Sequence, residues 1–242
     1  MSKPAPNSPP WAETAKFAAA KEALKFVVAD MALGLGTGST ANIFIELLGE
    51  HARKNNIQLR CAATSLASAE LARSQGLEVL DLDSIGPLDL AVDGADQVDS
   101  RRRLIKGYGG ACTREKIVEY SAKRFVVIAD MGKKSKQLDK AVPVEFLPFA
   151  KANVERGLMA LGAKRIELRT KPAEGSVPSP PFITDNGLQL LHVDFGIMKN
   201  PKKLEQAINE IPGVLENGLF ALRPADVVIF GKRDGNVKIL GL

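Results

Sequence analysis

Residues 31–48 read MALGLGTGSTANIFIELL, and this stretch decides how the first part of the chain folds. Residues 31–33 are apolar and predict a buried strand, whereas residues 34–40 (GLGTGST) are too rich in glycine and hydroxyl side chains to continue it. Apolar side chains then return at helical spacing, at Ile43, Phe44, Leu47 and Leu48. A strand, a glycine loop and a helix in this order are typical of an α/β domain that binds a phosphate at the start of the helix.

The glycine loop does not match the two best-known nucleotide signatures. The dinucleotide fingerprint requires a third glycine or alanine where Ser39 stands, and no acidic residue closes a clear strand about twenty residues later. The Walker signature is excluded because no Gly-Lys-Ser/Thr follows the loop. A small phosphorylated metabolite is the ligand that the loop favours, and an NAD-dependent oxidoreductase is kept as an alternative.

Residues 93–115 (DGADQVDSRRRLIKGYGGACTRE) concentrate the groups that could perform chemistry. The apolar segment 88–92 predicts a buried strand that ends at Asp93, so this carboxylate is expected where a parallel sheet ends and open α/β sheets bind ligands. A second short strand is expected just before Lys106. The glycines within residues 107–110 would allow the backbone to approach a ligand closely.

Thr113 begins a predicted helix that places Glu115 in its first turn, near free backbone N–H groups. The apolar residues that support this helix are Ile117, Val118, Ala122 and Phe125. A strand over residues 125–129 is expected to follow.

Farther out, the chain alternates helices and strands up to about residue 140 and then changes pattern. A first helix is predicted over residues 11–28, with Phe17, Ala20, Leu24 and Val27 on its core face. We expect an α/β fold with an open, mostly parallel, Rossmann-like sheet and a second, smaller α+β domain. The predicted parts are a disordered leader at 1–10, an α/β catalytic domain at 11–140 plus 222–242, an α+β domain at 141–221 and, inside the latter, an inserted mobile loop at 170–181.

Composition narrows the function classes. The chain has 242 residues, 45% hydrophobic content and a net charge of +5, but only residues 101–103 form a tight basic run and aromatic residues make up 5%, which argues against nucleic acid as a partner. Cys61 and Cys112 show no metal-ligand spacing and cannot form a disulfide framework, so a reducing compartment, the cytoplasm, is expected. No segment reads as a membrane span or signal peptide.

Six motifs, in order along the chain, resemble the A type of ribose-5-phosphate isomerase. They are GLGTGSTA at 34–41, VDGAD at 92–96, IKGYGGACTREK at 105–116, IADMGKK at 128–134, TDNG at 184–187 and IPGV at 211–214. The resemblance implies interconversion of D-ribose 5-phosphate and D-ribulose 5-phosphate through an enediolate, in the non-oxidative pentose phosphate pathway. It also implies that no metal or organic cofactor is used and that the protein is a homodimer or homotetramer.

The same resemblance implies a role for individual residues. Glu115 would carry the proton between carbons, Lys106 would stabilise the oxyanion, and Asp93 and Asp96 would contact sugar hydroxyls and assist ring opening. The substrate-binding residues implied are Thr37, Gly38, Ser39, Thr40, Asp93, Gly94, Ala95, Asp96, Lys106, Gly107, Tyr108, Gly109, Lys133 and Lys16.

The implied reaction requires that the enediolate be stabilised. A free glutamate has a pKa near ~4.3 and is a weak base for a carbon-bound proton, so Lys106 and nearby N–H donors would have to stabilise the enediolate. Gln97 stands where a glutamate is common and Tyr108 interrupts what is often a glycine run, and neither change removes a catalytic group. A non-catalytic sugar-phosphate sensor is the main alternative, although such a sensor would not need Glu115 together with Lys106.

Overall fold

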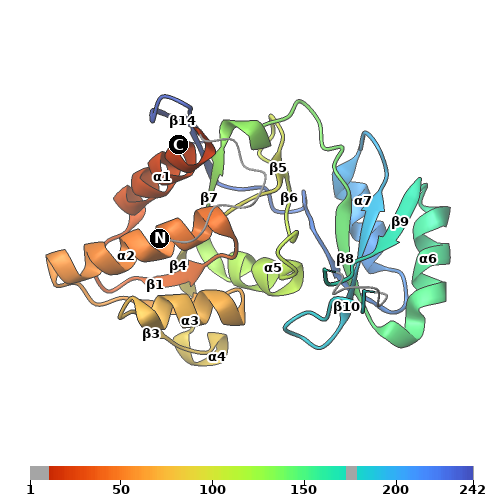
Figure 1. Ribbon diagram of the computed structural model, residues 1–242, viewed down its shortest axis with the longest axis horizontal. Helices are drawn as coiled ribbons and strands as arrows, with labels where there is room; N and C mark the ends of the chain where they lie inside the picture. The colour runs from red at the N-terminus through yellow and green to blue at the C-terminus, as the bar shows by residue number, and fades with distance from the viewer. Residues whose placement is uncertain (1–10, 173–178, 242) are drawn as a thin grey trace. The chain divides into compact units, whose positions relative to one another are not determined.

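The computed structural model describes residues 11–172 and 179–241, and its contacts divide the chain into two compact units (Figure 1). Unit 1 runs to Ala95, resumes over Arg114–Lys134 and resumes again from Ala225, while unit 2 consists of Asp96–Thr113 and Ser135–Pro224. The segment 96–113 therefore groups with unit 2, whereas the sequence placed it in the α/β domain. The predicted leader at 1–10 and the tip of the predicted loop at 170–181 lie outside the described residues.

Unit 1 is built on a seven-stranded sheet in the order β14-β13-β7-β4-β1-β2-β3. Every neighbouring pair is parallel except β13 and β14, so the predicted open, mostly parallel α/β sheet is confirmed. Its strands are β1 Ala32–Leu35, β2 Arg60–Ala63, β3 Glu78–Val79, β4 Leu88–Asp93, β7 Ala122–Asp130, β13 Val227–Gly231 and β14 Val237–Leu240. Its helices are α1 Trp11–Ala23, α2 Ser39–Asn55, α3 Leu66–Ser74, α4 Leu82–Ile85 and, beginning in unit 2, α5 Cys112–Tyr120, with 3-10 turns η1 Leu24–Phe26 and η2 Met131–Lys133.

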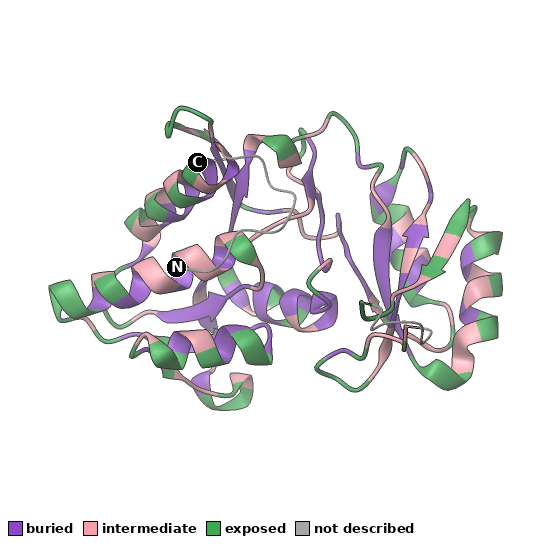
Figure 2. Cartoon of the chain, viewed as in Figure 1, coloured by how far each residue is buried: buried purple, intermediate pink, exposed green. Residues whose placement is uncertain are grey.

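Alternate residues of the central strands bury opposite faces of this sheet. On one face Leu33 and Leu35 of β1 join a core to which α1, α2 and α3 contribute (Figure 2). On the other face α5 lies so close to β1 that a Cβ added to Gly34 would fall 2.6 Å from Val118 Cγ1. The sheet thus fixes the helix that carries Glu115.

Helix α1 differs from its prediction in both length and core face. It ends at Ala23 and passes through η1 into extended backbone at Val27, instead of running to residue 28. Phe17 is 47% exposed, which corrects its assignment to the core. The buried face is made instead of small side chains, because α1 packs directly on β7 and β13. Its buried alanines are Ala12, Ala15, Ala19, Ala20 and Ala23.

The boundary between α5 and β7 was also misplaced by the sequence pattern. The helix ends at Tyr120, and Ala122 and Phe125 belong to the strand. The run of β-branched residues at 126–128 favours a strand, and β7 pairs on both sides with β4 and β13. Pairing on two sides therefore overrides the helical spacing seen in the sequence.

Unit 2 contains two antiparallel sheets, one of four strands in the order β11-β8-β10-β9 and one of three in the order β12-β6-β5. Its strands are β5 Gln97–Val98, β6 Leu104–Ile105, β8 Val142–Phe146, β9 Arg165–Leu168, β10 Gln189–Asp194, β11 Val214–Asn217 and β12 Leu219–Phe220. Its helices are α6 Lys151–Ala160 and α7 Pro201–Asn209, preceded by the 3-10 turn η3 Pro148–Ala150. Val144 and Phe146 of β8 face a core shared with α6 and α7.

The base of the predicted loop at 170–181 is a paired stem. Thr170 forms an antiparallel bridge with Pro181, and the Lys171 N–H donates to Pro180 O at 2.9 Å. The described ends of this insertion thus continue the strand β9 outward, which a composition rich in proline, glycine and serine did not indicate.

Candidate active site

In unit 1 the glycine loop is bonded to the aspartate at the end of β4. The Thr37 N–H donates to Asp93 Oδ1 at 2.9 Å, and the same oxygen accepts the Gly94 N–H at 2.6 Å. Asp93 is 1% exposed. Because β1 and β4 are parallel neighbours, the loop and the carboxylate leave the sheet at the same edge, as the sequence predicted.

A cluster of hydroxyl groups, not anticipated from the sequence, holds the other side of the loop. Thr37 Oγ1 lies 2.6 Å from Thr64 Oγ1 and 2.8 Å from Ser65 Oγ, and the Ser68 hydroxyl donates to Gly36 O at 2.7 Å. Ser65 also caps α3 by accepting the Ser68 N–H. The sequence indicated only that Ser65 could cap α3, because a serine often precedes the first turn of a helix. Nothing near Ser65 in the sequence indicated its hydrogen bond to Thr37.

Replacing Gly36 by alanine is expected to displace Asp93. The added Cβ would lie 1.9 Å from Asp93 Oδ1, which forces the carboxylate or the loop to move and breaks the Thr37 bond. Overpacking of this kind costs about 1–3 kcal/mol in unfolding free energy. Urea unfolding of the variant and of the wild type measures this loss of unfolding free energy.

Gly94→Ala is the matched control, because the nearest atom to its added Cβ is Ile128 O at 4.0 Å. We expect its unfolding free energy to stay within about 0.5 kcal/mol of wild type. Equal losses in the two alanine variants would show that the contact between Gly36 and Asp93 does not matter.

The start of α2 supplies the remaining loop residues. The helix begins at Ser39 after Gly38, whose φ of 114° suits glycine. Ser39 is exposed, and Gly38 and Thr40 are partly exposed. The first-turn N–H groups of a helix have no acceptor within the helix, so this end favours an anion.

The two remote lysines are placed differently. Lys133 ends η2, which follows the carboxyl end of β7 after Asp130 accepts the Gly132 N–H. It therefore lies at the same sheet edge as Asp93. Lys16 is buried on α1, and its ammonium binds Glu13 at 2.7 Å. A contact of Lys16 with substrate stays a prediction.

In unit 2, backbone hydrogen bonds hold Asp96 and Lys106 next to a glycine turn. Lys106 follows β6, is 2% exposed, and its N–H donates to Gly218 O at 2.9 Å. The turn closes with a bond from Gly110 N–H to Gly107 O, and both glycines have positive φ (93° and 99°). Asp96 Oδ2 accepts the Tyr108 N–H at 3.0 Å, so the Asp96 carboxylate is tied to the same turn.

The Tyr108 side chain anchors this turn to unit 2. Its hydroxyl donates to Ala141 O at 3.0 Å, and its ring stacks on His192 with centroids 5.2 Å apart. Burial, aided by the charges of Asp96 and Asp194, raises the pKa of Tyr108 to about 12, so the phenol stays a donor. Burial also lowers the pKa of His192, which keeps the stacked ring neutral at pH 7. Tyr108 thus has a supporting role that sequence alone did not reveal.

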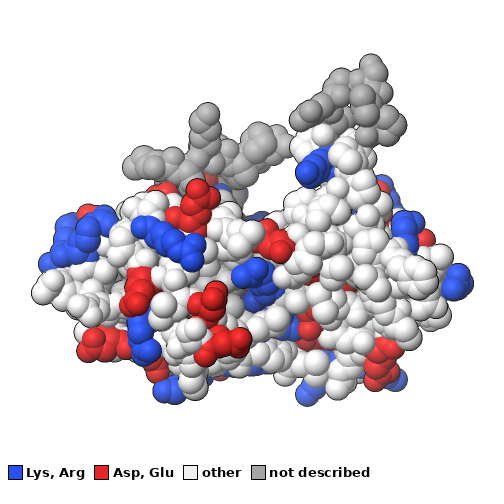
Figure 3. Space-filling model, turned by 90° about the horizontal axis from the view of Figure 1, so that it is seen from below, with Lys and Arg blue, Asp and Glu red and all other residues white. Residues whose placement is uncertain are grey.

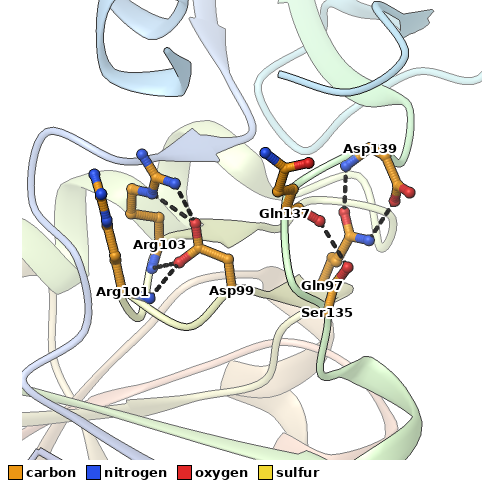
Figure 4. Close-up of polar contacts among 7 residues, drawn as sticks. All are labelled: Gln97, Asp99, Arg101, Arg103, Ser135, Gln137 and Asp139. Carbon is orange, nitrogen blue, oxygen red and sulfur yellow. Dashed lines mark hydrogen bonds and ion pairs between the residues drawn. The ribbon is translucent and has the colours of Figure 1, made fainter. Parts of the chain in front are cut away.

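The contacts of Gln97 with Asp139 explain why a glutamine stands at this position (Figure 4). Its Oε1 accepts the N–H groups of Asp139 and Lys140, and its Nε2 donates to Asp139 Oδ1 at 2.5 Å. Only an amide offers both a donor and an acceptor here, and a glutamate would bring two carboxylates together. The Lys140 ammonium in turn donates to Asp96 O at 3.0 Å, which connects this contact with the Asp96 backbone.

The basic run at 101–103 belongs to a turn. Buried Asp99 accepts the N–H groups of Arg101 and Arg103 and pairs with the Arg103 guanidinium at 2.5 Å (Figure 4). Acidic and basic side chains are interspersed on the face drawn in Figure 3. That the protein binds no nucleic acid stays a prediction.

Glu115 lies in the first turn of α5, as predicted, and is 2% exposed. Among residues 11–172 and 179–241, no three His, Cys, Asp or Glu side chains gather in a way that could hold a metal ion. No helix in the same described ranges is long and apolar enough to cross a membrane.

Comparison with known proteins identifies close relatives. The model of the family described as ribose 5-phosphate isomerase A (phosphoriboisomerase A) matches residues 60–235. A curated protein named ribose-5-phosphate isomerase A from Methanosarcina acetivorans is 45% identical over 225 residues, which cover 93% of each chain. One from Haemophilus influenzae is 45% identical and covers 90% of this chain and 94% of its own.

Two solved structures are similar over nearly the whole chain. A D-ribose-5-phosphate isomerase in complex with phospho-erythronic acid has a TM-score of 0.89 and 41% identity, covering 96% of this chain and 99% of its own. Ribose 5-phosphate isomerase A from Methanocaldococcus jannaschii has a TM-score of 0.87 and 39% identity, covering 94% and 98%.

Proposed function

The chain belongs to the ribose 5-phosphate isomerase A family, and we propose on that premise that it interconverts D-ribose 5-phosphate and D-ribulose 5-phosphate. This is an aldose-ketose isomerisation of the non-oxidative pentose phosphate pathway. The observation that carries the proposal is that Lys106 and Glu115 are each buried, at 2% exposed, with Lys106 directly after β6 and Glu115 in the first turn of α5.

The proposed chemistry begins with the Glu115 carboxylate taking the proton from C2 of the open-chain aldose. The electron pair left behind forms the C1–C2 double bond of an enediolate, and the carbonyl oxygen becomes an oxyanion that the Lys106 ammonium stabilises. Glu115 then returns the proton to C1, while a hydroxyl proton moves between the two oxygens. The product is the ketose, and Glu115 is again a carboxylate.

Asp93 and Asp96 are proposed to contact the sugar hydroxyls and to assist ring opening. Each carboxylate is already oriented by backbone N–H groups, Asp93 by Thr37 and Gly94 and Asp96 by Tyr108. An orientation fixed before substrate arrives lowers the entropy cost of reaching a reactive geometry. The start of α2 and Lys133 are proposed to bind the phosphate.

The solved relative that contains phospho-erythronic acid supports this assignment. That ligand is a phosphorylated sugar acid, and its planar carboxylate resembles an enediolate in shape and charge. A site that accepts such a molecule suits a transition state of the same character. We extend this ligand class to the present chain because the motifs around Asp93, Lys106 and Glu115 are present in it.

A direct assay tests the function. Purified protein should convert ribose 5-phosphate to ribulose 5-phosphate, and EDTA should leave the rate unchanged because the proposed oxyanion partner is a lysine. Binding of the sugar phosphate without turnover would favour the sensor alternative. Turnover that required NAD would favour the oxidoreductase alternative.

Assembly and compartment are proposed on the same basis. We expect a homodimer or homotetramer, and the exposed apolar side chain of Phe149, 95% accessible in unit 2, is the kind of surface that subunits cover. Light scattering during size-exclusion chromatography measures the assembly. Cys61 and Cys112 are both buried and form no disulfide, which agrees with the proposed cytoplasmic location.

A further inference from the structure

Unit 2 buries a carboxylate that the reaction does not use. Glu145 lies in β8, which pairs on both sides with β10 and β11, and it is 0% exposed. Its neighbours Val144 and Phe146 point to the core with α6 and α7, so Glu145 points to the opposite face of the sheet. A buried acid at an interior strand position is costly unless polar partners satisfy it.

Three side chains donate hydrogen bonds to this carboxylate. Thr184 Oγ1 donates to Glu145 Oε1 at 2.5 Å, Asn186 Nδ2 donates to the same oxygen at 3.1 Å, and Thr113 Oγ1 donates to Oε2 through a short bond. Thr184 Oγ1 already accepts the N–H groups of Asn186 and Leu188, so its own hydrogen is directed to Glu145. A side chain whose two oxygens both accept hydrogen bonds, such as that of Glu145, therefore suits this position.

The bond to Thr113 connects this network with the proposed base. Thr113 is the second residue of α5, and Glu115 follows in the same turn. Successive residues of a helix follow a fixed rise and rotation, so fixing Thr113 constrains where the Glu115 backbone lies. A carboxylate near the start of a helix is also favoured by the helix dipole.

We propose that Glu145, through Thr113, is a positioning residue for Glu115. This inference rests on the proposed function of Glu115 as the proton carrier. Loss of the bond leaves the substrate-binding groups in place but lets the first turn of α5 shift, and a misplacement of about 1 Å can cost about 10²-fold in rate. The expected signature is a lower kcat with little change in KM.

Thr113→Val tests the inference because it removes the donor and keeps the shape. We expect kcat for ribose 5-phosphate to fall by about ten- to a hundredfold, with KM within about twofold of wild type. Thr113→Ser keeps the hydroxyl and should restore most of kcat. Thr184→Val is the matched control, because it breaks a different bond to Glu145 together with two turn bonds but leaves the link to α5.

The stability of each variant separates positioning from simple folding support. Positioning predicts that Thr184→Val lowers the melting temperature more than Thr113→Val but lowers kcat less. A kcat that follows the melting temperature across the variants, or a Thr113→Val enzyme with wild-type kcat, overturns the inference. Failure of the proposed function looks different, since the wild type would be inactive or Glu115→Gln would remain active.

Discussion

Replacing Glu115 by glutamine is expected to remove nearly all isomerase activity while leaving the fold and substrate binding largely intact. The amide has the size of the carboxylate but cannot take a proton from C2. Proton transfer by a positioned side chain contributes about 10²–10⁴-fold to a rate, so kcat should fall by about that factor. Initial rates with ribose 5-phosphate measure the loss, and calorimetric titration of the variant with ribose 5-phosphate measures the retained binding.

Glu119 provides the matched control on the same helix. It lies one turn after Glu115 and is 0% exposed, so Glu119→Gln makes the same chemical change in a comparably buried place. We expect this variant to change stability more than kcat. Equal losses of kcat in the two variants would mean that α5 tolerates no amide, and the role of Glu115 as base would lose its support.

The sequence predicted the central part of unit 1 well because its strands are buried on both faces. Such strands appear as short, mostly apolar runs, with Asp89 the one charged residue inside β4, and β1 and β4 end next to a glycine and at an acid. The edge of a parallel sheet then determines where the loop and Asp93 emerge. This part of the candidate site followed from local pattern and one topological rule.

The parts that the sequence did not predict depend on partners distant in the chain. Glu205 lies on α7 and would be assigned to a solvent face, yet it is 0% exposed because its carboxylate accepts the N–H groups of Ala221 and Leu222. Glu145 and the hydroxyls of Thr64 and Ser68 are similar cases. Burial of a polar group depends on whether donors come to it, and residue spacing along one element carries no information about that.

Replacing Lys106 by methionine is expected to cause the second large loss of activity. Methionine fills the space of the lysine stem. The Lys106 ammonium lies 5.7 Å from the ring centroid of Phe220. Removal of one well-placed oxyanion donor costs about 10²–10³ in kcat, or about 3–4 kcal/mol of transition-state stabilisation. Steady-state kinetics measure the loss, and circular dichroism checks the fold.

The control for Lys106→Met is the same substitution at Lys116, a lysine on α5 that is 5% exposed. It removes a buried positive charge without removing the proposed oxyanion partner, so it should lower stability and spare kcat. The division between kcat and KM then identifies the role of Lys106. Loss of an interaction made only in the transition state lowers kcat and kcat/KM equally. A rise in KM at constant kcat would instead make Lys106 a ligand of the bound sugar phosphate in its ground state. Backbone N–H groups would then be left to stabilise the enediolate.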